Sequence, residues 1–304
     1  MKAFVTGATG FVGQHLVNRL LELGYEVAIL VRDRSKLRAE WKDSSALTVI
    51  EKDMNTLIAG GELGSEYDVI YHFAWAGTSG QLRANEGVQL ENIENTCALV
   101  RMAAEAKVKR FVFAGSIMEY EAQKFVGGDG KRPSGAVLYS VAKLSADYMA
   151  KTLCASLGIE YVNLLISNIY GVGERSARFL NTMLGKMGRG ERCDLSAGLQ
   201  LYDFIYIDDA VRAIELAGSK GRDGGEYYIG NPAQRPLREF VEEMNAIVNK
   251  GSQLNFGAIS SGGNFLNYKE FNTSALYNEL GFTAEISFAD GVKRTYDWLE
   301  GREE

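Results

Sequence analysis

Cysteine, histidine and long apolar runs are scarce in this chain of 304 residues, and each scarcity excludes a class of protein. The three cysteines, Cys97, Cys154 and Cys193, are odd in number and far apart, which argues against a disulfide framework. With only two histidines, His15 and His72, and no metal-ligand spacing among the cysteines, a metal site is not expected. No apolar run approaches the roughly 18 residues that a membrane-spanning helix needs. The sequence therefore predicts a metal-free protein that does not cross a membrane.

A strong charge of one sign is also lacking. The formal net charge is −6, from 33 basic and 39 acidic residues, and no block of like charges occurs. This balance argues against nucleic acid or an anionic membrane surface as the main partner. The N-terminal sequence "MKAFVTGATG" enters a glycine-rich segment after three apolar residues, so it does not read as a signal peptide. We expect a cytoplasmic protein.

What the sequence does contain is a regular alternation of short apolar runs and amphipathic stretches. Strands are predicted at residues 2–7, 25–31, 46–53, 67–75, 110–116 and 159–166, and helices at 11–24, about 88–106 and 137–157. Strands that alternate with helices indicate right-handed βαβ units and a parallel sheet that is buried on both faces. The predicted fold class is therefore α/β, with a doubly wound parallel sheet.

The second half of the chain is less regular. A helix at 177–191, a strand running into a helix at 202–218, a strand at 225–231 and a closing helix at about 290–299 are predicted. No linker is visible. We therefore expect one domain from residues 1–166 plus about 203–232. Residues of about 167–202 plus 233–304 would form a smaller, mixed substrate-binding region.

A glycine-rich turn joins the first predicted strand to the first predicted helix. "TGATGFVG" places Gly7, Gly10 and Gly13 three residues apart. A dinucleotide site needs a tight turn, a backbone that the pyrophosphate can approach, and a helix N-terminus facing that anion. The spacing differs from the common G-x-G-x-x-G pattern. At the start of a βαβ pattern, however, it predicts cofactor binding in a Rossmann-type sheet.

Residues after the second and third strands bear on the choice of cofactor. An acidic residue after the second strand holds a ribose 2′-hydroxyl, whereas an arginine accommodates a 2′-phosphate. Arg32 follows that strand directly and favours NADP, while Asp33 keeps NAD possible. Asp53, after the third strand, is either a contact to the adenine amino group or a solvated turn residue.

A tyrosine and a lysine lie four residues apart in "LYSVAKLSAD", residues 138–147. Tyr139 and Lys143 would share one face of a helix, where the ammonium stabilises a phenolate and makes proton exchange possible near neutral pH. The spacing alone is weak evidence, because Tyr120 and Lys124 repeat it.

Seven segments together resemble the extended short-chain dehydrogenase/reductase family of NAD(P)-dependent nucleotide-sugar epimerases, dehydratases and reductases. They are "TGATGFVG", "YHFAW", Asn92 in "ENIENT", "FAGSIMEY", "YSVAK", "SNIYG" and "YDFIYIDDAVRAI". They occur in the family's order between about Lys2 and Gly230. The last seventy residues match no motif.

The resemblance implies a role for each of several residues. Ser116, Tyr139 and Lys143 match the catalytic set. Tyr139 is preferred to Tyr120 because it lies 23 residues beyond Ser116 on a predicted helix, whereas Tyr120 runs into "FVGGDG" and is expected in a loop near the substrate. The expected cofactor contacts are Gly7, Thr9, Gly10, Phe11, Val12, Gly13, Arg32, Asp53, Met54, Phe73, Ala74, Ala76, Asn92, Tyr139 and Lys143. The expected substrate contacts are Thr78, Ser79, Ser116, Tyr139, Asn168 and Arg178. Two of these residues also have a purely structural interpretation. Ser116 would be a strand-end serine whose hydroxyl is hydrogen-bonded to the backbone, and Arg178 would lie on a solvated helix face.

Departures from the family pattern narrow the expected reaction. Ile117 and Met118 follow Ser116 where dehydratases of the family carry an Asp-Glu pair, so elimination of water is not expected. Gly115 stands where many members have a second serine. Leu165 and Tyr202 replace two arginines that are usual in the family. This weakens the expectation that the chain makes the family's usual phosphate contacts.

The leading hypothesis is an NADP-preferring 4-ketoreductase of a nucleoside-diphosphate 4-keto-6-deoxyhexose. One alternative is a nucleotide-sugar 4-epimerase that retains NAD and recycles its hydride. An alternative of another class is a redox sensor that binds the cofactor without chemistry; the complete Ser116, Tyr139 and Lys143 set argues against it. The resemblance also implies a homodimer formed by the helices at about 88–106 and 137–157.

Overall fold

A computed structural model describes residues 1–64, 66–126, 134–260 and 266–302. The chain divides into two compact units. The first contains Met1–Ile166 and Val211–Tyr227, and the second contains Ser167–Ala210 and Tyr228–Glu304. We describe each unit by itself.

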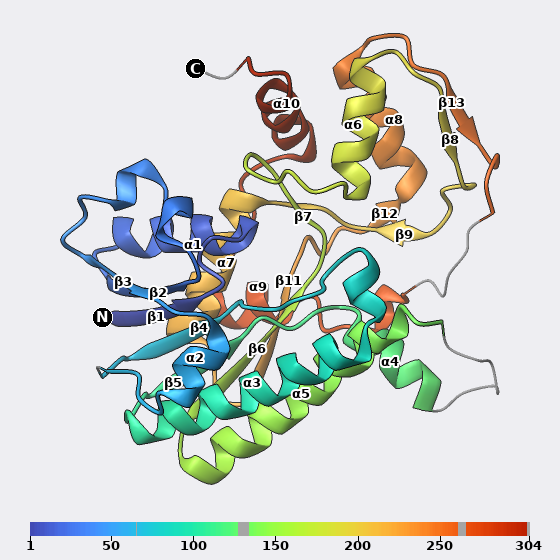
Figure 1. Cartoon of the computed structure of the whole chain (residues 1–304). Coiled ribbons are helices and arrows are strands. Elements are labelled where there is room, and N and C mark those ends of the chain that lie inside the picture. The colour runs from blue at the N-terminus through green and yellow to red at the C-terminus, as the bar shows by residue number, and fades with distance from the viewer. Residues whose placement is uncertain (65, 127–133, 261–265, 303–304) are drawn as a thin grey trace. The chain divides into compact units, whose positions relative to one another are not determined.

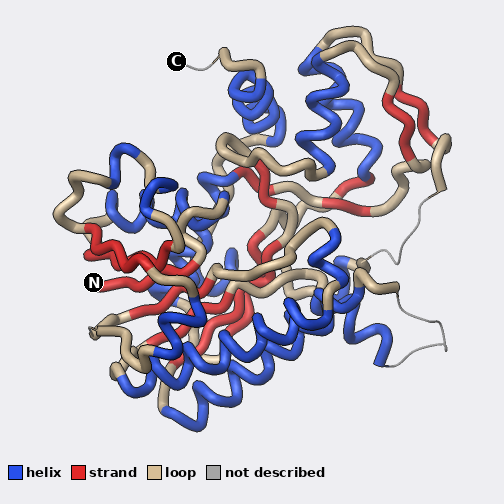
Figure 2. The backbone as a smooth tube through the Cα atoms, in the orientation of Figure 1, coloured by secondary structure: helices blue, strands red, loops and turns tan. Residues whose placement is uncertain are grey.

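A seven-stranded sheet with the order β11-β6-β5-β4-β1-β2-β3 forms the centre of the fold (Figures 1 and 2). Its strands are β1 (Lys2–Thr6), β2 (Glu26–Val31), β3 (Leu47–Glu51), β4 (Val69–His72), β5 (Arg110–Phe113), β6 (Glu160–Ile166) and β11 (Gly225–Ile229). All neighbours from β3 to β6 pair in parallel. The strands are nearly continuous apolar runs, as expected for a sheet that is covered on both faces. The predicted Rossmann-type architecture is confirmed.

Helices cover both faces of this sheet. The elements are α1 (Phe11–Glu22), α2 (Met54–Ala59), α3 (Glu86–Glu105), α4 (Glu119–Val126) and α5 (Val137–Leu157). Figure 1 shows α3 and α5 side by side on one face and α1 on the other. Leu99 of α3, Ala150 of α5 and the strand residues Phe4, Ile70 and Phe111 are all fully buried in one cluster. The α5 bounds agree with the prediction at both ends, and Gly158 in the left-handed conformation ends the helix.

The second unit is built from short elements. They are β7 (Ile169–Tyr170), α6 (Phe179–Gly188), β8 (Cys193–Leu195), β9 (Leu201–Tyr202), β10 (Ile205–Tyr206), β12 (Arg235–Pro236), α8 (Leu237–Val248), β13 (Leu254–Phe256), α9 (Ala275–Leu280) and α10 (Phe288–Leu299). The helix α7 (Ile207–Lys220) crosses the division between the units. The fully buried carboxylate of Asp203 accepts hydrogen bonds from Ser167, Asn231 and Tyr268, which ties distant parts of this unit together. None of the described helices is long and apolar enough to span a bilayer.

The helices α4 and α8 differ from the sequence-based expectation. Tyr120 was expected in a loop, but it lies in α4, which continues to Val126; residues 127–130 of "FVGGDG" are outside the described ranges. The expectation was wrong because a hydrogen-bonded turn leads into a helix ahead of the glycines: the Ser116 N–H donates to Glu119 Oε1, and the Met118 N–H donates to Ser116 Oγ. The helix α8 was not predicted, although Phe240, Val241, Met244 and Val248 are buried at helical spacing.

Candidate active site

The turn between β1 and α1 has room only for glycine at two positions. Gly7 has a φ of +72°, and a Cβ there would lie 2.6 Å from the Phe73 carbonyl carbon. A Cβ on Gly13 would lie 2.1 Å from the Gly7 oxygen. Because Gly7 has no Cβ, the turn can lie against the chain that leaves β4. Because Gly13 has none, α1 can lie against the turn. The result is an exposed backbone at a helix N-terminus, with Phe11 and Val12 in the first helical turn.

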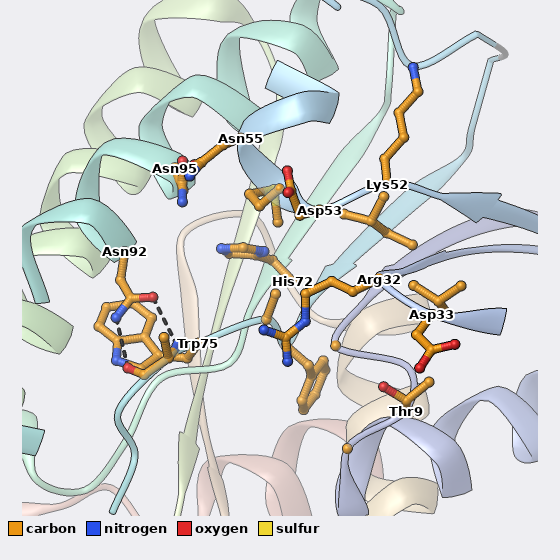
Figure 3. Close-up of a pocket in the computed structure, with 18 of the residues that line it drawn as sticks. Thr9, Arg32, Asp33, Lys52, Asp53, Asn55, His72, Trp75, Asn92 and Asn95 are labelled. Carbon is orange, nitrogen blue, oxygen red and sulfur yellow. Dashed lines mark hydrogen bonds between the residues drawn. The ribbon is translucent and has the colours of Figure 1, made fainter. Parts of the chain in front are cut away.

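A cavity of about 580 Å³ opens beside this turn (Figure 3). Ten of the predicted cofactor contacts line it: Gly7, Thr9, Gly10, Arg32, Asp53, Met54, Phe73, Ala74, Ala76 and Asn92. The lining also contains residues that sequence reasoning did not select, among them Lys36, Lys52, Asn55, Trp75 and Asn95. Asn55 and Asn95 had a usable signal, because they lie within three residues of selected positions. No sequence signal marks Lys36, because it lies beyond the end of the second predicted strand.

Asn92 holds the loop after β4 in place. Its side-chain amide donates to the Ala76 carbonyl and its oxygen accepts from the Ala76 N–H, both at 2.9 Å (Figure 3). Thr6 Oγ1 accepts from the Ala74 N–H at 3.1 Å. Gln89 donates to the Gly77 and Leu82 carbonyls. Buried polar side chains therefore replace sheet hydrogen bonds along a segment that forms one wall of the cavity.

The charged groups at the mouth of the cavity differ in what they already bind. The Asp33 carboxylate accepts from the Ser35 N–H at 2.9 Å, and this bond lowers the pKa of Asp33. Asp53 accepts from the Thr56 N–H at 2.7 Å and caps α2, which likewise lowers its pKa, with a smaller contribution from Arg32. The guanidinium of Arg32 makes no hydrogen bond within the described ranges, and Figure 3 shows it reaching across the cavity while Lys52 extends away.

Tyr139 and Lys143 lie on α5, and both are almost fully buried. Lys143 Nζ donates to the Ala114 carbonyl at 2.7 Å and lies 3.7 Å from the centre of the Trp75 ring. The Tyr139 ring meets Trp75 edge to face, at 6.3 Å between centroids. Trp75 lines the cavity, so this ring connects the predicted catalytic pair to it, although neither Tyr139 nor Lys143 is among the lining residues. A cation above the face of an indole ring is attracted to it. Here this interaction holds the Lys143 ammonium one helical turn from Tyr139.

Ser116 is also buried and begins the turn that leads into α4. Its Oγ accepts from the Met118 N–H at 3.2 Å, and its backbone N–H donates to Glu119 Oε1 at 2.7 Å. Because the hydroxyl oxygen is held as an acceptor, the hydroxyl hydrogen remains available as a donor. The structure thus places Ser116 at the carboxyl end of β5, the edge at which sheets of this kind bind ligands.

Arg83 was not selected from the sequence, yet it contacts the predicted catalytic tyrosine. Its guanidinium carbon lies 4.0 Å from the centre of the Tyr139 ring, and its Nη1 donates to the Thr78 carbonyl at 3.0 Å. Thr78 and Ser79 are exposed on this loop. The loop that was expected to shape the pocket is thereby joined to α5.

Two further predicted substrate contacts belong to the second unit. Asn168 Nδ2 donates to Asp203 Oδ1 at 3.3 Å. Arg178 is exposed, and its Nε lies 3.7 Å from Glu174 Oε2. Their roles stay predictions.

Comparison with known proteins settles the family. The model of the NAD dependent epimerase/dehydratase family matches residues 3–230. The chain belongs to this family. It is 26% identical to CDP-abequose synthase of Salmonella muenchen over 98% of both chains. It is 25% identical to dTDP-glucose 4,6-dehydratase of Streptomyces antibioticus, over 98% of this chain and 92% of the other.

Solved structures of family members share the fold. The UDP-glucuronic acid 4-epimerase of Bacillus cereus in complex with NAD superposes with a TM-score of 0.79 and 22% identity, covering 99% of this chain and 96% of the other. The family is therefore one of nucleotide-sugar enzymes of the extended short-chain dehydrogenase/reductase type, as the sequence predicted.

The residues present fit the dinucleotide that the family name implies. A Cβ would fill the cradle at Gly7, the turn presents backbone N–H groups at a helix N-terminus, and the adjoining cavity has the size of a ligand site. The Arg32 guanidinium at its mouth suits an anionic group.

Proposed function

We propose that this member of the epimerase/dehydratase family is an NADPH-dependent 4-ketoreductase of a nucleoside-diphosphate 4-keto-6-deoxyhexose. The observation that carries the proposal is the contrast between the residues that are present and those that are replaced. Ser116, Tyr139 and Lys143 are all present and buried, whereas Ile117 and Met118 follow Ser116. Ile117 is buried and apolar, so the two positions that carry the Asp-Glu pair in dehydratases of the family carry no carboxylate. An enzyme that is equipped to reduce a ketone but not to make the 4-keto sugar is suited to consuming that intermediate.

The nicotinamide, when bound, supplies the hydride for the carbonyl carbon. Tyr139 gives a proton to the substrate oxygen as negative charge develops there. Ser116 donates a hydrogen bond to the same oxygen, since its own oxygen is engaged by Met118. Lys143 stabilises the tyrosinate that remains. Trp75 and Arg83 pack around the tyrosine and restrict the access of water.

Support for NADPH comes from the mouth of the cavity. The Asp33 carboxylate is engaged by the Ser35 N–H, whereas the Arg32 guanidinium points into the cavity. An arginine at this position suits a ribose 2′-phosphate, and an engaged aspartate competes less for the 2′-hydroxyl of NAD.

The assay follows the loss of reduced-nicotinamide absorbance with CDP-, dTDP-, GDP- and UDP-linked 4-keto-6-deoxy sugars. The CDP-linked sugar comes first because a relative that matches almost the whole chain is CDP-abequose synthase. We expect stoichiometric oxidation of NADPH with one of the four. The absence of oxidation, together with interconversion of UDP-glucose and UDP-galactose without added cofactor, would instead identify a 4-epimerase.

A further inference from the structure

A histidine at the end of β4 is buried between two threonines. His72 is 2% exposed, and both threonines are fully buried. Its Nδ1 lies 2.8 Å from Thr6 Oγ1 of β1, and its Nε2 lies 3.0 Å from Thr96 Oγ1 of α3. The imidazole ring therefore forms a buried polar link between the sheet and α3.

Each threonine also binds a second group. Thr6 Oγ1 accepts from the Ala74 N–H at 3.1 Å. Thr96 Oγ1 donates to the Asn92 carbonyl, one turn earlier on α3, at 2.8 Å. The Asn92 side chain in turn binds both the N–H and the carbonyl of Ala76. A chain of hydrogen bonds thus leaves the loop after β4 at Ala74, passes through the buried histidine and returns to the loop at Ala76.

The number of hydrogens in this chain determines which ring nitrogen carries the proton. The Thr96 hydroxyl has one hydrogen and gives it to the Asn92 carbonyl, so Thr96 Oγ1 accepts from the Nε2–H of His72. The Nδ1 of an uncharged ring then accepts from the Thr6 hydroxyl. With the proton on Nδ1 instead, the buried Thr6 hydroxyl hydrogen would have no acceptor among the described residues. Burial, with a smaller contribution from the Lys143 charge, lowers the pKa of His72 to about 3, which agrees with an uncharged ring.

The loop segment between the two ends of the chain forms one side of the cavity. The lining residues in and around it are His72, Phe73, Ala74, Trp75, Ala76 and Asn92 (Figure 3). The Ala74 nitrogen packs against the glycine-rich turn, since a Cβ on Gly7 would lie 2.7 Å from it. The Trp75 ring lies 3.7 Å from Lys143 Nζ and meets Tyr139 edge to face. The chain therefore holds a segment that reaches both the dinucleotide turn and the predicted catalytic pair.

We propose that His72 is a positioning residue of the dinucleotide site. With its proton on Nε2 it joins Thr6 to Thr96, and the chain that it completes holds residues 74–76 in the conformation that binds the cofactor. The proposal rests on the proposed function only where this segment meets the predicted catalytic pair. If the segment adopted the binding conformation for only a fraction of the time, the apparent Kd of the cofactor would rise by the inverse of that fraction. A polar link that merely stabilised the fold would not have this effect.

Matched variants separate positioning from general stability. Thr96→Val keeps the shape of the side chain and removes the acceptor of the Nε2 proton, whereas Thr96→Ser keeps the hydroxyl. His72→Phe removes both ring nitrogens in an aromatic setting, since Phe111 and Phe113 lie 5.8 and 6.2 Å away between ring centroids. Val100→Ala is the control, because Val100 is fully buried one turn after Thr96 on α3 and takes no part in the chain. Thermal unfolding measures the stability of each variant, and Thr96→Val carries the test if His72→Phe does not fold.

The first readout requires neither cofactor nor activity. Nitrogen-15 NMR distinguishes a protonated from an unprotonated imidazole nitrogen. The chain has only two histidines, so the His72 signals are those that remain in His15→Asn. We expect wild-type His72 to carry its proton on Nε2 alone near neutral pH. A proton on Nδ1 instead would overturn the proposal, because the Thr6 hydroxyl would then lose its acceptor.

The second readout is the affinity for the cofactor, measured by titration with both NADPH and NADH so that the result does not depend on the proposed preference. We expect Kd to rise roughly twofold to tenfold in Thr96→Val, which is the range of one net hydrogen bond, and at least as much in His72→Phe. Thr96→Ser should restore the affinity, and Val100→Ala should lower the unfolding temperature without weakening binding. Unchanged affinity in folded Thr96→Val, or an equal rise of Kd in Val100→Ala, would refute the positioning role.

Failure of the proposed reaction is distinguishable from failure of the positioning role. Weaker cofactor binding in Thr96→Val, together with no reduction of any 4-keto sugar by the wild type, would uphold the role of His72 and reject the reaction. A wild type that binds neither NADPH nor NADH would overturn both.

Discussion

At the scale of single residues, two tyrosines with the same Tyr-x-x-x-Lys spacing lie in different surroundings. Tyr139 is buried against Arg83 and against Trp75, which lines the cavity. The Tyr120 hydroxyl donates to Glu226 at 3.0 Å, and burial together with this carboxylate raises the pKa of Tyr120 above its usual value. A phenol that is held by a carboxylate is a poor proton donor to substrate. The environment, rather than the spacing, distinguishes the two.

We therefore expect Tyr139→Phe to lower kcat at least about a hundredfold, the lower end of what general acid–base catalysis contributes, with NADPH affinity close to wild type. The ring keeps its packing and only the proton is lost. Tyr120→Phe is the matched control and should stay within a few-fold of wild type. Steady-state kinetics and fluorescence titration of NADPH measure both effects. A greater loss in Tyr120→Phe would reverse the assignment.

Arg32 is expected to determine the cofactor preference. Loss of its charge-assisted contact in Arg32→Ala should cost about 1.5–3 kcal/mol, which is roughly a tenfold to hundredfold rise in KM for NADPH, with little change for NADH. Arg34→Ala is the control, because Arg34 is already engaged with the Val49 carbonyl and Glu51. Kinetics with both cofactors test this. Equal use of NADH and NADPH by the wild type would contradict it.

At the scale of elements, the chain between β4 and α3 is ordered by side chains of α3 rather than by strand pairing. The predicted strand at 67–75 ends at His72, and Asn92 and Gln89 hold the loop beyond it. The apolar run continues past the last sheet partner, so its length overestimated the strand. This loop carries Trp75 and Arg83 to the predicted catalytic tyrosine.

Asn92→Leu should leave the Ala76 N–H and carbonyl without partners. We expect a loss of about 1–3 kcal/mol in the free energy of unfolding and weaker NADPH binding, because an unpaired buried polar group costs about that much. Asn95→Leu is the control, one turn later on α3 and lining the same cavity. Urea unfolding with and without NADPH measures both. Equal effects in the two variants would show that the hydrogen bonds between Asn92 and Ala76 are not what stabilises the loop.

At the scale of the whole molecule, α3 and α5 pack on the sheet and still expose large apolar side chains. Leu90 of α3 is 58% exposed, and Tyr148 and Met149 of α5 are 60% and 47% exposed. Apolar residues gathered on adjacent helices are typical of an association surface. They agree with the predicted homodimer, in which these helices would form a four-helix bundle.

We expect light scattering of the wild type to give the mass of a dimer at micromolar concentration, and Tyr148→Glu to give a monomer, because a buried unpaired carboxylate opposes association. Leu199→Glu is the control, since Leu199 is 73% exposed but belongs to the second unit. A monomeric wild type would refute the prediction.

Features that depend on neighbours in the chain could be read from the sequence. The Gly7–Gly13 turn, the strand–helix alternation and the α5 helix all result from local steric and periodic rules, which is why the family and the fold were predicted. The hydrogen-bonded turn from Ser116 to Glu119 that leads into α4 is local too, but the expectation of a loop gave more weight to the glycines beyond it than to this turn.

Features that depend on distant segments were decided only by tertiary structure. Trp75 and Lys143 are 68 positions apart and become neighbours because the loop after β4 lies against α5. Glu119 looks in the sequence like an ordinary charged helix residue. It becomes a buried partner of Ser116 and Asn163 because β5 and β6 are adjacent in the sheet. Burial removes the water that would otherwise screen its charge, and no local pattern in the sequence reports how much water remains around a side chain.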